Sequence, residues 1–99
     1  MAWIITKDNL FHASDSTEAR LGMKSEVGVR SHKWDEIIAK NPKAETFAFR
    51  MLDDDGEVYY EGKSTVADSF APLDDFGMPN AGCTEIQYRN GDNHSWEGL

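Results

Sequence analysis

The chain has 99 residues and a formal net charge of −8 at neutral pH, and this length provides for one small hydrophobic core because a second domain would need about as many residues again. No stretch approaches the roughly 18 apolar residues of a membrane span, which excludes a transmembrane protein. Eleven aromatic residues, several in alternating runs, favour a folded chain despite the high charge, so residues 1–99 are expected to form a single domain.

The first predicted element is a short strand at Trp3–Thr6, which is rich in β-branched and aromatic residues. The apolar run before Lys7 has only four residues, which is too short for a secretion signal. Cys83 is the only cysteine, so no disulfide can form within the chain. Both observations predict a cytoplasmic protein.

The segment 11–30 has the weakest pattern, because Gly22 and Gly28 interrupt it. Its apolar residues recur with a period of two and favour short extended segments; they are Leu21, Met23, Val27 and Val29. A short amphipathic helix is predicted next, with Ser31 as its N-cap and Lys40 as its last residue. Three apolar residues form one face of this helix: Trp34, Ile37 and Ile38. Asn41 and Pro42 then end it.

The clearest pattern is a β-hairpin, in which strands at Glu45–Leu52 and Glu57–Glu61 flank the turn Asp53–Gly56. Apolar residues alternate along both strands, and the Asp-Gly step suits a tight turn that needs a positive φ. The residues expected to face the core are Phe47, Phe49, Met51, Val58 and Tyr60.

Two elements are predicted after the central hairpin. Residues Ser69–Gly77 have the pattern of a helical turn that begins at Pro72 and ends at Gly77, with Phe70, Leu73 and Phe76 packed inward. A second hairpin joins Cys83–Arg89 to His94–Glu97 through Asn90-Gly91, with Thr84, Ile86 and Tyr88 facing inward.

This order of elements predicts an α+β fold: a small, mainly antiparallel sheet of about four or five strands with one short amphipathic helix packed on one face. A parallel, doubly wound arrangement is not supported by the pattern, because helices do not alternate with the strands along the chain.

Three blocks of the chain resemble a group of short bacterial proteins without an assigned activity. The blocks are Leu52–Gly62, Phe70–Gly77 and Asn80–Arg89, which read LDDDGEVYYEG, FAPLDDFG and NAGCTEIQYR. Proteins of that group also tend to begin with a strand similar to Trp3–Asp8. The resemblance therefore provides similar proteins for comparison, but it implies no activity, cofactor or partner for this chain.

The negative charge is concentrated in the second half of the chain. Residues Met1–Leu52 contain eight Lys and Arg against seven Asp and Glu, whereas Asp53–Leu99 contain two against eleven. A field of this sign repels phosphate, so direct binding of nucleic acid or of an anionic membrane is not expected, while a basic protein is attracted. The alternative is that the charge only confers solubility. The expected partner-binding residues are Asp53, Asp54, Asp55, Tyr59, Asp74 and Asp75.

Metal and catalytic sites find little support. Placing Gly56 at position six of a calcium loop puts Met51 at position one and Gly62 at position twelve, where both should be carboxylates. Asp74 and Asp75 are adjacent, and neighbours in a helical turn diverge by about 100°, which does not suit a convergent acid–base pair. No metal site, no cofactor and no catalytic residue is therefore predicted.

Cys83 is the one candidate nucleophile, and a nearby imidazole would have to activate it. The three histidines, His12, His32 and His94, are far apart in sequence and lack paired ligand spacing. A lone cysteine at the start of a strand is more often a small buried hydrophobic residue.

We therefore expect a small acidic, non-enzymatic binding or regulatory protein that docks a basic partner through its C-terminal half. Three alternatives remain open. One is a phage-associated inhibitor of the anti-CRISPR or DNA-mimic type, whose carboxylates replace phosphates. Another is a small enzyme or ligand carrier that uses Cys83 or the pair Asp74 and Asp75. The last is a homo-oligomer that pairs strand edges.

Overall fold

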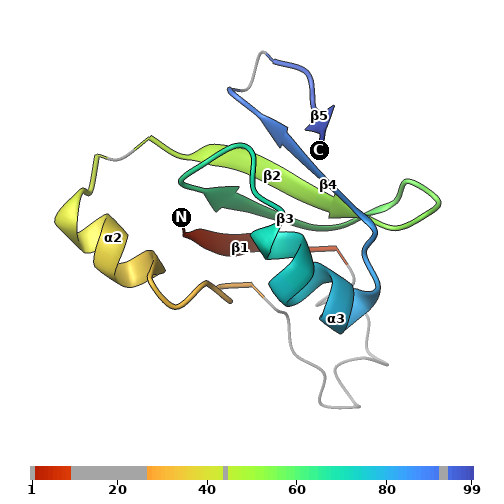
Figure 1. Cartoon of the computed structure of the whole chain (residues 1–99), viewed down its shortest axis with the longest axis horizontal. Coiled ribbons are helices and arrows are strands. Elements are labelled where there is room, and N and C mark those ends of the chain that lie inside the picture. Colours follow the sequence, from red (N-terminus) through yellow and green to blue (C-terminus); the bar gives the residue numbers. More distant parts are fainter. Residues whose placement is uncertain (1, 10–26, 44, 92–93) are drawn as a thin grey trace.

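A computed structural model describes residues 2–9, 27–43, 45–91 and 94–99. It confirms the α+β class, with one five-stranded antiparallel sheet in the order β1-β3-β2-β4-β5. The expected extended segments at Leu21 and Met23 lie outside the described residues. The elements in Figure 1 are β1 (Trp3–Asp8), α2 (Trp34–Lys40), β2 (Phe47–Leu52), β3 (Val58–Ser64), the π-helical segment η1 (Leu73–Gly77), α3 (Met78–Ala81), β4 (Glu85–Arg89) and β5 (Glu97–Gly98).

The central hairpin forms, and Phe49, Met51 and Tyr60 face the core as predicted, but near the turn Tyr59 packs against the core in place of the predicted Val58. Strands β2 and β3 are antiparallel neighbours, and Met51 pairs with Tyr60 and Phe49 with Gly62. A bulge between Met51 and Leu52 shifts the register just before the turn. Gly56 has a φ of 82° in that turn, a conformation that favours glycine.

One face of the sheet carries the hydrophobic core, and a helix over residues 71–81 covers it (Figure 1). The Phe76 ring packs edge-on against Tyr60 at 4.9 Å between centroids, and it also contacts Trp3 at 5.8 Å. The buried residues of this cluster come from every long strand and from the helix: Trp3, Ile5, Phe49, Met51, Tyr60, Leu73, Phe76, Cys83, Ile86 and Tyr88.

The helical turn differs from the sequence expectation at both ends. Gly77 does not end the helix: its φ is −63°, and α3 continues to Gly82, whose φ of 71° ends it. Gly77 is needed for close packing instead, because a Cβ there would lie 2.5 Å from Met51 Sδ. The prediction that Phe70 packs inward is also wrong, since this side chain precedes the helix and is 48% exposed.

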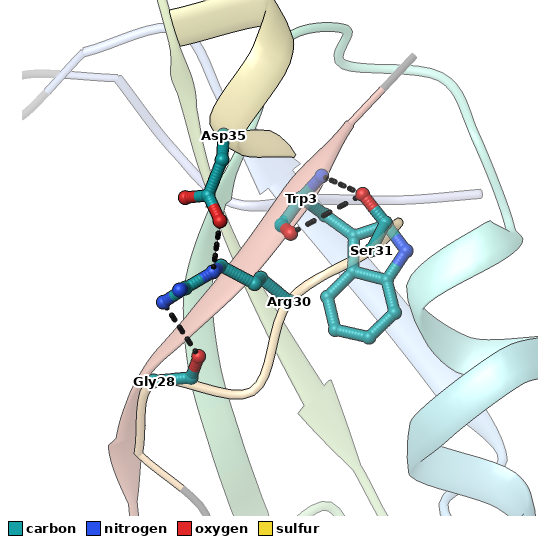
Figure 2. Close-up of polar contacts among 5 residues, drawn as sticks. All are labelled: Trp3, Gly28, Arg30, Ser31 and Asp35. Carbon is teal, nitrogen blue, oxygen red and sulfur yellow. Dashed lines mark hydrogen bonds and ion pairs between the residues drawn. The ribbon is translucent and has the colours of Figure 1, made fainter. Parts of the chain in front are cut away.

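The predicted amphipathic helix is present as α2, but it begins at Trp34 and Ser31 does not cap it. Figure 2 shows that the Ser31 hydroxyl turns toward β1 instead, where it accepts a hydrogen bond of 3.0 Å from the Trp3 N–H. The ion pair between Arg30 and Asp35 then joins this segment to α2. No residue of α2 is buried. The helix that supplies side chains to the core is therefore the one over residues 71–81.

Residues 28–31 also occupy the outer edge of β1. The Ile5 N–H donates to the Val29 carbonyl and the Gly28 N–H to the Ile5 carbonyl, both at 2.8 Å, and the Ser31 N–H donates to the Trp3 carbonyl at 2.9 Å. This pairing covers an edge that would otherwise be open to another strand.

The second hairpin is shorter than expected. Strand β4 buries Ile86 and Tyr88 as predicted, but Thr84 is exposed and lies before the strand, where its N–H donates to the Leu52 carbonyl. Strand β5 contains only two residues, because the chain from His94 to Trp96 does not join the ladder. Residues 92 and 93 of this hairpin lie outside the described residues.

Candidate functional site

The turn between β2 and β3 is organised by the carboxylate of Asp53. Its Oδ1 accepts hydrogen bonds of 2.9 Å from the N–H groups of Asp55 and Glu57. The hydrogen bond from Glu57 is the main cause of the lowered pKa of Asp53, because it stabilises the ionised form. Asp53 therefore holds the turn in shape, and it leaves Asp54, Asp55 and Glu57 exposed at the tip.

Tyr59 lies beside this turn and is half-buried against the core rather than fully exposed. A hydrogen bond with Asp53 is the main cause of the raised pKa of Tyr59, and burial adds to it. The structure thus brings Tyr59 and Asp53 together, and both have partners within the turn region.

Asp74 and Asp75 are exposed on η1. The helix lies over the covered face of the sheet, whereas the turn between β2 and β3, which carries Asp54 and Asp55, projects beyond the end of the sheet (Figure 1). The four exposed aspartates among the six expected partner-binding residues therefore lie in two separate groups, whereas Asp53 and Tyr59 have partners within the turn region. We call the two groups the acidic turn (Asp54 and Asp55, together with the exposed Glu57) and the acidic helix (Asp74 and Asp75).

Neither acidic group is neutralised by a neighbour in the described part of the chain. The ion pairs there join Lys7 to Glu61 at 3.6 Å, Arg30 to Asp35 at 3.0 Å and Lys40 to Glu36 at 2.9 Å. None of them uses a carboxylate of the acidic turn or the acidic helix, so these carboxylates face solvent without a cationic partner among the described residues.

The described residues do not bring Cys83 together with a histidine that could activate it. Cys83 is fully buried, and burial raises the pKa of its thiol to about 11, so it is protonated at neutral pH. His94 and Cys83 lie beyond opposite ends of β4, and His32 follows the segment that pairs with β1; His12 lies outside the described residues. In the same ranges, no group of three or more His, Cys, Asp or Glu is arranged to hold a metal ion.

A second cluster, which was not predicted from the sequence, lies on the face of the sheet opposite the core. The guanidinium carbons of Arg50 and Arg89 each lie 4.5 Å from the centroid of the Trp96 ring. Arg50 Nε also donates a hydrogen bond of 2.6 Å to Gln87 Oε1. The alternation of β2 and β4 places Arg50 and Arg89 out of phase with the buried residues, which was a usable signal; the position of Trp96 had none.

This second face, which we call the open face (Ala48, Arg50, Lys63, Gln87 and Arg89), also carries a hollow of about 320 Å³. The hollow is lined by Glu45, Thr46, Ala48, Lys63, Asn90 and Gly91. A smaller hollow of about 140 Å³ lies beside it, between the end of β4 and the C-terminal segment. Asn90 contributes to both hollows.

The described residues define a small α+β protein in which a helix covers one sheet face, none of the described helices covers the other, and two acidic groups are exposed. The chain matches no protein-family model, no curated protein and no solved structure. No helix within the described ranges is long and apolar enough to cross a membrane.

Proposed function

We propose that this is a non-enzymatic binding protein that docks a basic protein partner through its acidic groups. The observation that carries the proposal is the exposure of the carboxylates of the acidic turn and the acidic helix without ion-pair partners among the described residues. Unpaired carboxylates attract a basic surface over the screening length of about 8 Å at physiological ionic strength.

The non-enzymatic part of the proposal is supported by the state of Cys83. A thiolate is the reactive form of cysteine, and the buried, protonated thiol of Cys83 is a poor nucleophile at neutral pH. A free thiol buried in the core also agrees with a reducing compartment, so we include a cytoplasmic location in the proposal.

Matched double variants test the docking surface. Asp54→Asn with Asp55→Asn removes two charges from the acidic turn, and Asp74→Asn with Asp75→Asn removes two from the acidic helix. Asp53 stays unchanged because it shapes the turn. Asp35→Asn with Glu36→Gln is the control, since it removes the same charge from α2.

The partner is first captured from cell extract with the wild-type protein and purified, and its association rates are then measured at low and high ionic strength. We expect at least one of the two acidic double variants to associate several-fold more slowly at low ionic strength and to show a weaker salt dependence, while the control behaves as wild type. Equal rates and equal salt slopes for all three variants would refute the proposal.

A further inference from the structure

Three cations lie close together on the open face. Ala48 pairs with Arg89 on one neighbouring strand and with Lys63 on the other, so these two residues flank a single methyl group in one row across the sheet. Arg50 follows two residues later on the same face of β2. Because the Ala48 side chain is so short, the row is not filled, and the hollow of about 320 Å³ opens there.

The arginines of this cluster are held in place. The Trp96 ring centroid lies 4.5 Å from both guanidinium carbons. Arg50 is also held by the hydrogen bond that its Nε donates to Gln87 Oε1. A guanidinium that uses its flat face on an aromatic ring still has N–H groups at its rim for an anion. Among the described residues, no carboxylate forms an ion pair with Arg50 or Lys63.

The lining of the hollow supplies donors of three kinds: the Lys63 ammonium group, the Thr46 hydroxyl and the Asn90 amide. A phosphate group has several strong acceptor oxygens and can accept from all three. The volume is at the small end of ligand sites, so it suits a compact ligand. A polyanion such as nucleic acid fits poorly, because the chain has a net charge of −8 and the acidic turn lies at the other end of the same strands.

We propose that the hollow around Ala48 binds a phosphate monoester of a small hydroxylated molecule. Lys63 pairs with the phosphate, with Thr46 and Asn90 as further donors, and the field of Arg50 and Arg89 adds to the attraction. Glu45 also lines the hollow, and its carboxylate accepts hydrogen bonds from ligand hydroxyl groups, which is why a polyol ester is expected rather than the bare ion.

Titration followed by backbone amide and indole NMR signals tests the site. Glycerol phosphate is the probe, inorganic phosphate tests the contribution of the hydroxyl groups, and acetate at matched ionic strength tests for general anion attraction. We expect a saturable response at Thr46, Ala48, Asn90 and the Trp96 indole with glycerol phosphate, and a weaker one with inorganic phosphate. The absence of a saturable response, or an equal response to acetate, overturns the proposal.

Variants separate binding from folding. Lys63→Gln should weaken glycerol phosphate binding about tenfold, as loss of one charged hydrogen bond does, and Lys63→Arg should retain most of it. Lys40→Gln on α2 removes the same charge and should change nothing. Ala48→Leu fills the hollow without altering the charge and should abolish binding in a chain whose NMR spectrum stays folded. Equal affinities for Lys63→Gln and Lys40→Gln would contradict the site.

The outcome is independent of the acidic docking surface. The double variant Asp54→Asn with Asp55→Asn should bind glycerol phosphate at least as well as wild type, because it removes negative charge from the other end of the sheet. Failure of the phosphate site therefore leaves the proposed protein partner untouched, and failure of the protein partner leaves the phosphate site untouched.

Discussion

The two faces of the sheet differ in their interactions: apolar packing dominates one face, and cation–π contacts and hydrogen bonds are found on the other. The covered face excludes water with interlocking rings and methyl groups, such as Phe76 between Trp3 and Tyr60. The buried hydroxyl of Tyr88 on this face has a hydrogen-bond partner, since it donates to the Ser69 carbonyl at 2.7 Å. The open face has polar contacts instead: Trp96 lies against Arg50 and Arg89, and Arg50 donates a hydrogen bond to Gln87. Stability should therefore reside on the first face, and the second is available for binding.

The strongest test of this difference compares one aromatic residue from each face. Phe76→Ala removes a ring that is only 4% exposed and should lower the free energy of unfolding by about 3–5 kcal/mol. Trp96→Ala removes a half-buried ring and two cation–π contacts, which should cost about 1–2 kcal/mol. Urea denaturation measures both, and a larger loss for Trp96→Ala would reverse the assignment of the faces.

A second test adds a methyl group to the covered face. A Cβ at Gly62 would lie 2.5 Å from Phe49 Cζ and still closer to the Ile4 carbonyl oxygen. Backbone cannot move aside in the middle of a sheet, so Gly62→Ala should cost about 3 kcal/mol through overpacking. The neighbouring Lys63 points to the open face, and Lys63→Ala should change stability by no more than about 0.5 kcal/mol. Similar losses for the two variants in thermal denaturation would show that the open face is also tightly packed.

Alkaline pH should weaken the covered face. Burial raises the pKa of the Cys83 thiol from 9.0 to about 11, so the folded state keeps a proton that the unfolded state releases. This contribution is complete below pH 9.0 and is lost as the pH rises toward about 11. The urea midpoint of the wild type should fall over this range, and that of Cys83→Ser should fall less.

The same burial predicts the reactivity of the thiol. Iodoacetamide should leave Cys83 unmodified in the folded protein near neutral pH and modify it after denaturation, as mass spectrometry would show. Rapid labelling under native conditions would mean that the helix over residues 71–81 does not stay closed over the core.

The smallest effect is expected at the acidic turn. Hydrogen bonding lowers the pKa of Asp53 below its ordinary 3.8, so its contribution to stability is present above that pH and is lost as the pH falls through the lowered value. Asp53→Ala should therefore be less stable than wild type at neutral pH, and the difference should shrink in acid. Asp54→Ala is the control, because Asp54 is exposed. Thermal denaturation across acidic pH would contradict the role of Asp53 if both variants behave alike.

Local patterns predicted the central hairpin and the inward residues of β4 because alternation decides which side chains a strand buries. Phe49, Met51 and Tyr60 face the core for this reason. The acidic character of the turn and of the helix was likewise readable, since it depends only on which residues occupy them. Their separation in space was not, because distance between elements is not encoded in a local pattern.

Side chains whose partners lie far away in the chain were assigned wrongly. Ser31 had the pattern of a helix cap, but its hydroxyl bonds to Trp3, 28 residues away. Gly77 had the pattern of a helix stop, but it admits the Met51 sulfur instead. Serine and glycine each suit several local roles, and the nearest packed neighbour decides between them.

The sequence by itself determined the α+β class, the hairpin with its Asp-Gly turn, and the excess of acidic residues after Leu52. Tertiary structure alone decided which helix covers the sheet, and it placed Trp96 against Arg50 and Arg89. The physical reason is range: strand alternation and turn conformation arise from neighbouring residues, whereas packing and electrostatic contacts depend on which distant segments meet when the sheet closes.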